Sequence, residues 1–172
     1  AARAPTHTHS LMVSKPMHAL NDASDALRLI TQAGQRLAQV TGITEVNDST
    51  WVIDFDGGDG FMAEWSADGS RLVLTADLGL PTPEGELSAL NLALSYNALW
   101  REIGDLRIAR DGDEGELMLI GELGPEDSEP ETFNAALLHF VALRRWWADA
   151  IARAASANPA PPAPPGVMFE RI

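Results

Sequence analysis

The sequence contains no cysteine, and this absence excludes several kinds of site at once. Disulfide cross-links, cysteine-ligated zinc, iron–sulfur clusters and thiol nucleophiles all require cysteine. The chain of 172 residues must therefore fold through its hydrophobic core. A domain of about this length buries roughly 68–70% of the surface that its unfolded chain exposes, so such a core is large enough to be stable alone. A cysteine-free chain also fits a reducing compartment.

Basic residues are scarce. The chain has 12 Lys and Arg against 25 Asp and Glu, which gives a formal net charge of −13, and Lys15 is its single lysine. A surface of this sign repels phosphate backbones, whereas a nucleic-acid-binding protein needs the opposite sign. We therefore expect no nucleic-acid partner. An acidic surface keeps a protein in solution and suits a basic or aggregation-prone partner.

Long apolar runs are also missing. No segment approaches the roughly 20 consecutive apolar residues that a membrane-spanning helix needs, and no charged-then-apolar signal segment opens the chain. The sequence therefore predicts no membrane insertion.

The two ends differ in composition from the middle. Residues 1–19 show no sustained period and are expected to form a flexible N-terminal arm, while residues 157–172 form a proline-rich C-terminal tail. The tail contains the extended stretch NPAPPAPP and ends in the apolar segment GVMFERI. That segment either adds as a strand to a sheet edge or stays free, and we favour the free end. Residues 20–156 are expected to be the folded domain.

The first half of this domain reads as one helix followed by three strands. A helix is predicted over residues 21–41, with Asn21 or Asp22 as the N-cap and Gly42 after the C-terminus. Its apolar residues at helical spacing are Ala23, Leu27, Ile30, Leu37 and Val40. Segments 50–56, 61–66 and 71–77 are rich in β-branched and aromatic residues, and glycine turns separate them. They predict an antiparallel meander.

The second half reads as helix, two strands, helix. Thr82 and Pro83 are typical of a helix start, and the stripe that follows is Leu87, Leu90, Leu94 and Asn97. Strands are predicted over 105–110 and 116–123, and a last helix from Ser128 to about residue 155. The predicted order is α-β-β-β-α-β-β-α, which is an α+β domain with three helices.

The motifs for common chemistry are missing. Asp54, Asp56 and Asp59 lie near a glycine turn, but an EF-hand counted from Asp54 would need glutamate at its twelfth position, which is Trp65. The patterns HExxH, GxSxG, GxGxxG and GxxxxGK[ST] do not occur. We therefore predict no catalytic residues, no metal and no cofactor, so the chain is not expected to be an enzyme. A site scattered along the chain stays open as an alternative.

The helices carry more apolar surface than one buried face needs. In the last helix, Leu137, Val141 and Trp146 lie outside the main apolar stripe. In the first helix, Leu29 widens the arc around Leu27 and Ile30. These wide faces are either fully buried by other elements or form a groove for an apolar peptide.

Several of these features together resemble a known family. They are the LAQVTGI segment, the meander with its AspGlyGly and AspGly turns, LeuGlyLeuPro at 78–81, the leucine-rich LSALNLALSYNALW, and the closing FNAALLHFVALRRWWADAI helix. Over about residues 20–155 the arrangement resembles the type III secretion chaperones of the Tir-chaperone (CesT) family.

The resemblance implies a cytosolic bacterial homodimer in which each subunit is a twisted antiparallel sheet with helices against it. Its partner would be the N-terminal segment of one or more secreted effectors, kept non-globular and soluble and delivered to the export apparatus, with the secretion ATPase as a further partner. Clients in such families bind partly by adding a strand and partly by filling apolar pockets. An alternative is an adaptor of the same fold that binds a folded protein.

Two sets of residues follow as candidates. The expected dimer interface, on the second helix and the strands after it, consists of Leu90, Leu94, Ala98, Leu106, Ile108, Leu117 and Leu119. The expected effector-binding residues, on the first helix and the first predicted strand, are Leu27, Ile30, Leu37, Trp51 and Ile53.

Overall fold

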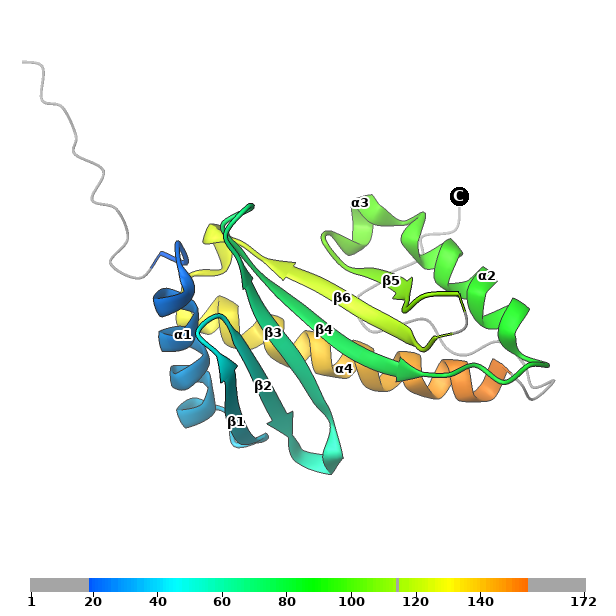
Figure 1. Ribbon diagram of the computed structural model, residues 1–172, viewed down its shortest axis with the longest axis horizontal. Coiled ribbons are helices and arrows are strands. Elements are labelled where there is room, and N and C mark those ends of the chain that lie inside the picture. The colour runs from blue at the N-terminus through cyan, green and yellow to red at the C-terminus, as the bar shows by residue number, and fades with distance from the viewer. Residues whose placement is uncertain (1–18, 114, 155–172) are drawn as a thin grey trace, which may run out of the picture.

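The computed structural model describes residues 19–113 and 115–154, which form an α+β domain (Figure 1). The predicted N-terminal arm, save Ala19, and the predicted proline-rich tail lie outside the described residues. The helices are α1 (Ala23–Arg36), α2 (Glu86–Asn97), α3 (Trp100–Ile103) and α4 (Pro130–Ala154), with short 3-10 turns η1 (Asp56–Gly58) and η2 (Pro125–Asp127). The strands are β1 (Val40–Asn47), β2 (Thr50–Phe55), β3 (Gly60–Ser66), β4 (Arg71–Gly79), β5 (Arg107–Arg110) and β6 (Leu117–Leu123).

The six strands form one antiparallel sheet in the order β1-β2-β3-β4-β6-β5. The first four strands follow the chain as a meander. β6 then pairs with β4 although α2, α3 and β5 lie between them in sequence, and β5 forms the far edge. The α+β class, the antiparallel sheet and the meander are thus confirmed, with one more strand than the sequence predicted.

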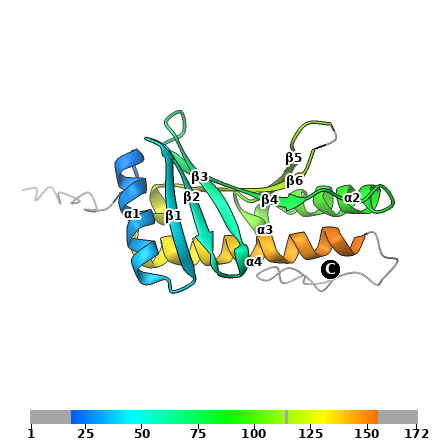
Figure 2. The ribbon, with the colours of Figure 1, turned by 60° about the horizontal axis from the view of Figure 1, so that its bottom comes forward.

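All of the long helices contact the same face of the sheet. Along β2, Trp51, Ile53 and Phe55 are buried, while the residues between them face the other side. α4 crosses this inner face and packs on β4 and β6, and Figure 2 shows it running along one side of the sheet. The Phe61 and Phe140 rings meet edge to face at 5.2 Å in the middle of this core.

The additional strand, β1, corrects the predicted length of the first helix. Asp22 caps α1 as expected, its side chain accepting the Asp25 N–H at 2.9 Å. However, α1 ends at Arg36, and the chain becomes extended at Leu37. Residues 40–46 are rich in β-branched side chains, which favour a strand. Gly42, predicted to follow the helix end, lies inside β1 opposite Asp54.

A glycine in α1 allows the helix and β1 to pack closely. A Cβ atom on Gly34 would lie 2.6 Å from Cδ1 of Ile43, which is closer than carbon atoms approach. Gly34 therefore brings α1 directly against the edge of the sheet.

The second helix also starts later than predicted. Residues 82–85 form a turn in which the Gly85 N–H donates to the Thr82 carbonyl at 3.0 Å, and α2 begins at Glu86. At the C-terminal end of α2, the Asn97 side chain hydrogen-bonds to the β5 backbone as a neighbouring strand would. Its amide donates to the Ile108 carbonyl and its oxygen accepts the Ile108 N–H, both at 2.9 Å. This pair fastens the end of α2 to β5.

The aspartates that failed the calcium pattern serve as structural anchors. Asp56 and Asp59 lie at η1, the turn between β2 and β3. The Arg144 and Arg145 guanidinium groups on α4 both pair with Asp59, and Arg145 also pairs with Asp56 at 2.9 Å. The turn is thereby attached to α4.

None of the described helices is long and apolar enough to cross a membrane.

We expect the inner face of the sheet to dominate stability. Truncating the buried Ile53 to Ala should lower the free energy of unfolding by about 2–5 kcal/mol, because it removes buried methyl groups and leaves a cavity. The matched control is Val46→Ala on the exposed part of β1, which should change it by less than about 0.5 kcal/mol. Urea unfolding followed by far-UV circular dichroism measures both, and equal effects would contradict this assignment of the core.

Candidate functional site

Exposed leucines mark one side of α2. Leu87 and Leu94 are seven residues apart, so they share one helix face, and they are 72% and 67% exposed. Leu90 and Ala98 continue the same line. We call Leu87, Leu90, Leu94 and Ala98 the α2 stripe. Beyond it, Trp100 on α3 is 61% exposed, with the Arg101 guanidinium 4.6 Å from its ring centre.

α2 carries apolar residues on its outer side as well as on its inner side, unlike an ordinary surface helix. Ala89 and Ala93 are buried on the side towards the domain, and Leu90 and Leu92 are half-buried against the core, while Leu87 and Leu94 face outwards. Tyr96 is the buried anchor, and its ring meets Trp147 of α4 edge to face at 5.1 Å. A helix that turns leucines to solvent while packing alanines inside is typical of one that a partner covers.

The structure divides the predicted dimer residues into two groups. Leu94 and Ala98 are exposed and Leu90 is half-buried, all on the α2 stripe. The strand residues of the prediction lie elsewhere: Ile108, Leu117 and Leu119 are buried on the inner face, and half-buried Leu106 lines a cavity described below.

The reason for this correction is the alternation of β6. Its residues from Leu117 to Leu123 are alternately buried and half-buried. All four residues of the run Leu117–Ile120 are apolar, so both sides of the strand look alike in the sequence. The sequence therefore does not show which side faces the helices. In the structure Leu117 and Leu119 face them, while Met118 and Ile120 face the open side.

Three further exposed apolar residues on or near the α2 stripe were not among the predicted interface residues. They are Leu80, which follows β4, Leu87 and Trp100. A signal existed for Leu87, because it lies on the same helical stripe as Leu90 and Leu94. Nothing in the local pattern marked Leu80 or Trp100 as exposed.

A shallow groove runs between α1 and the edge strand β1. Its volume is about 240 Å³, and it is lined by Thr31, Gly34, Gln35, Val40, Thr41, Gly42 and Ile43. Leu27, one helical turn before Thr31, is 36% exposed. Among the described strands β1 pairs with β2 alone, so within residues 19–113 and 115–154 its other edge carries backbone N–H and C=O groups with no strand partner. The groove therefore combines apolar side chains with a free strand edge.

The structure also corrects part of the predicted effector site. Leu27 is exposed and Leu37 is half-buried, so both are accessible. Ile30, Trp51 and Ile53 are at most 1% exposed and belong to the core, so they do not line an open pocket in this subunit. Ile30 lies on the inward side of α1, and Trp51 and Ile53 are the inward residues of β2.

The open face of the sheet carries a second apolar area. Val52, Met62, Thr75 and Ile120 are direct neighbours across four strands. A hollow of about 350 Å³ lies beside this row, next to Gly60 and Met118. Met62 is 38% exposed there. The described helices contact the opposite face and leave this one uncovered.

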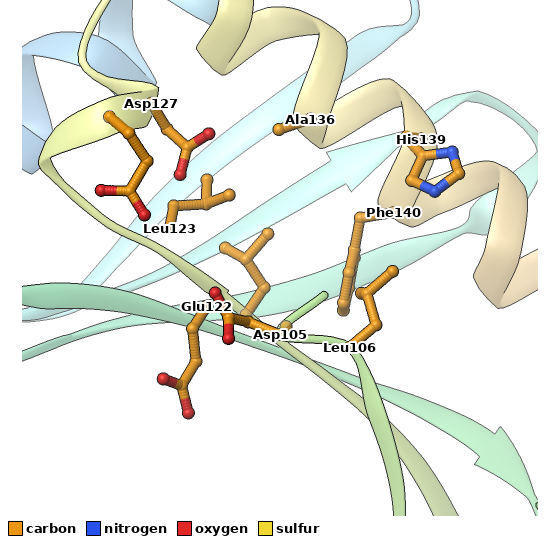
Figure 3. A pocket seen from close by; sticks show the side chains of 11 residues that line it. Asp105, Leu106, Glu122, Leu123, Asp127, Ala136, His139 and Phe140 are labelled. Atoms are coloured by element: carbon orange, nitrogen blue, oxygen red, sulfur yellow. The ribbon is translucent and has the colours of Figure 1, made fainter. Parts of the chain in front are cut away.

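A third hollow, of about 230 Å³, lies between β6, α4 and the loop before β5 (Figure 3). It has an apolar floor that includes Phe140 and Leu123, and acidic residues at its margin. Within the described residues, no group of three or more histidine and carboxylate side chains is placed to hold a metal ion.

Residues 28–148, more than two thirds of the chain, match the model of the Tir chaperone protein (CesT) family. The chain belongs to this family. It is a family of chaperones and not of enzymes, which confirms the expectation from the missing motifs. No curated protein matches the sequence.

Two solved structures share the CesT fold of this chain. One is the crystal structure of the ExsC-ExsE complex, with a TM-score of 0.61 and 20% identity over 75% of this chain and 95% of that one. The other is the HopA1-SchA chaperone–effector complex, with a TM-score of 0.57 and 16% identity over 73% of this chain and 94% of that one. At these identities the likeness concerns the fold.

The pKa of the single tyrosine, Tyr96, reports on the packing of α2 against α4. Burial raises the pKa of Tyr96 to about 12, against about 10 for a free tyrosine. The folded state therefore keeps the phenol proton to higher pH than the unfolded state. The resulting stabilisation is complete below pH 10 and is lost as the pH rises through 12.

A phenolate absorbance titration should give a midpoint about two pH units higher in the folded protein than in denaturant, with circular dichroism checking the fold at each pH. A folded protein that titrates near pH 10 would show that Tyr96 is not buried under α4.

Proposed function

We propose that this CesT-family protein is a type III secretion chaperone that binds the N-terminal segments of one or more secreted effectors. It keeps the bound segment non-globular and soluble and delivers it to the export apparatus in the bacterial cytoplasm, where the secretion ATPase acts downstream. The observation that carries the proposal is uncovered apolar surface in separate places on a strongly acidic domain. The fold shared with a chaperone–effector complex supports it.

The α2 stripe is the proposed dimer contact. Fully burying one large apolar side chain stabilises an assembly by about 1.5–3 kcal/mol. Leu87, Leu94 and Trp100 are each more than 60% exposed, so most of this contribution is still available in the single subunit. Helices related by a two-fold axis present the same residues to each other, which suits one repeated stripe.

The α1–β1 groove is the proposed effector site, and it replaces the buried part of the predicted one. An extended peptide can pair with the free edge of β1 while its apolar side chains enter the groove. Leu27 and Leu37 are the accessible anchors that remain from the predicted set.

The acidic surface completes the division of labour. A client segment that stays extended exposes apolar groups that aggregate in water. A net charge of −13 keeps the complex in solution and favours encounter with clients that carry basic residues.

The α2 stripe should control the state of association. Leu94→Asp places a charge in the proposed contact and should convert the dimer to a single subunit of 18.5 kDa, because an unpaired buried charge is strongly unfavourable. Light scattering after size exclusion measures the mass. The control is Leu27→Asp, which should remain dimeric, and an unaltered mass for Leu94→Asp would contradict the assignment.

The α1–β1 groove should control client binding independently. Leu27→Asp should weaken binding of an effector N-terminal segment by tenfold or more, because a carboxylate that the client covers without pairing it costs more than the 1.4 kcal/mol that corresponds to tenfold. Fluorescence anisotropy with labelled N-terminal segments of the source organism's effectors measures the affinity. Wild-type affinity in the Leu27→Asp dimer would show that the groove is not the client site.

A further inference from the structure

The hollow between β6 and α4 has the size of one side chain. Its volume is about 230 Å³, whereas a water molecule occupies roughly 30 Å³ and pockets for drug-sized ligands begin near 300 Å³. It is lined by Leu74, Asp105, Leu106, Gly121, Glu122, Leu123, Glu126, Asp127, Ala136, His139 and Phe140. It is thus too small for a cofactor and too large for a single water.

The inner part of this cavity is apolar. Leu74, Leu123 and Phe140 are buried and form its floor. Leu106 and Phe140 close one end, since both lie 3.1 Å from where a Cβ of Gly121 would be. In Figure 3 the Asp127 carboxylate lies at the opposite end from Phe140. An occupant must therefore have an apolar part towards Phe140.

The outer part is acidic and lacks a cation. Among the described residues, Asp105, Glu126 and Asp127 form no ion pair with any arginine, although Glu122 beside them pairs with Arg71 at 2.8 Å and also with Arg107. Within the part of the chain that the structure describes, the Asp127 carboxylate accepts one hydrogen bond, from the Gly124 N–H at 3.0 Å.

The surroundings of Asp127 act on its pKa in both directions. Burial raises the pKa of Asp127, the Gly124 hydrogen bond partly lowers it, and Glu126 and Asp105 raise it further. The remaining titratable groups facing this cavity are Glu122 of β6, already paired, and the exposed His139 of α4. A cation placed among these carboxylates would remove their mutual repulsion.

We propose that this cavity binds an arginine side chain of the client polypeptide, with its aliphatic stem on Leu123 and Phe140 and its guanidinium at the carboxylates of Asp127 and its neighbours. The partner rests on the proposed chaperone function. Arginine fits better than lysine because its planar group offers several donors to two carboxylates and is less strongly hydrated.

The test uses the full chain and a small probe that represents the side chain alone. N-acetyl-L-arginine amide is titrated into ¹⁵N-labelled protein, and amide shifts of Gly121 and Leu123 are followed. We expect saturable shifts with a Kd in the millimolar range, and at least fivefold weaker binding of N-acetyl-L-citrulline amide, which has the same shape without the charge. The lysine analogue should bind at least twofold more weakly than arginine.

Two variants locate the effect. Ala136→Leu should fill the cavity and abolish the saturable shifts, and Glu126→Gln should weaken arginine binding at least threefold. The matched control is Glu129→Gln, an exposed glutamate outside the lining, which should leave the affinity unchanged. Equal binding of arginine and citrulline, or arginine binding that survives Ala136→Leu with an otherwise unchanged spectrum, would overturn the proposal.

The test of the arginine cavity and the test of the proposed chaperone function can fail independently. The probe titration reports on the cavity even if no effector segment binds, whereas the Leu27→Asp comparison reports on client binding. In a client that binds, replacing its arginines with citrulline should weaken binding to the wild type more than binding to Ala136→Leu, since both proteins share the acidic surface. Equal weakening of both proteins would show that no client arginine uses this cavity.

Discussion

The packing of α4 across one face of the sheet is the contact on which the remaining structure depends. Phe140 meets Phe61 at the centre of the sheet, Trp147 holds Tyr96 of α2, and Arg144 and Arg145 hold the β2–β3 turn. The sheet, α2 and the β2–β3 turn are thereby all attached to α4. The core lies on this one face of the sheet. Apolar side chains that do not fit into the core remain exposed on the surface of the subunit.

The outward surfaces follow from this arrangement. α2 packs Ala89, Ala93 and Tyr96 against the domain, and Leu87 and Leu94 on its outer side face solvent. α1 reaches just to the edge strand and leaves a groove beside β1. No described helix covers the open face of the sheet. A single-layer core with excess apolar surface is a sound design for a protein whose task is to hold other polypeptides, and the high negative charge offsets the tendency to aggregate.

The sequence predicted the periodic elements well and their orientation poorly. Alternation and glycine turns were sufficient for β2, β3 and β4. β1 was missed because Leu37 and Val40 continue the helical period of Ile30 and because Gly42 fits a helix end. The β-branched residues at 40–46 are the local feature that favours a strand there. The burial of the candidate site residues on strands could not be predicted for another reason. Trp51, Ile53, Leu117 and Leu119 are apolar, but which side of a sheet is covered depends on where α4 packs, and that is a long-range contact.

The proposed dimer requires that Leu87, Leu94 and Trp100, which are exposed in one subunit, are covered in solution by a second copy. Hydroxyl-radical footprinting of the unmodified protein over a dilution series tests it most directly, with exposed Val46 as internal reference. We predict that these three side chains are labelled much more slowly than their exposure in the single subunit implies, and that dilution restores the rate. Labelling in proportion to that exposure at every concentration would contradict the account.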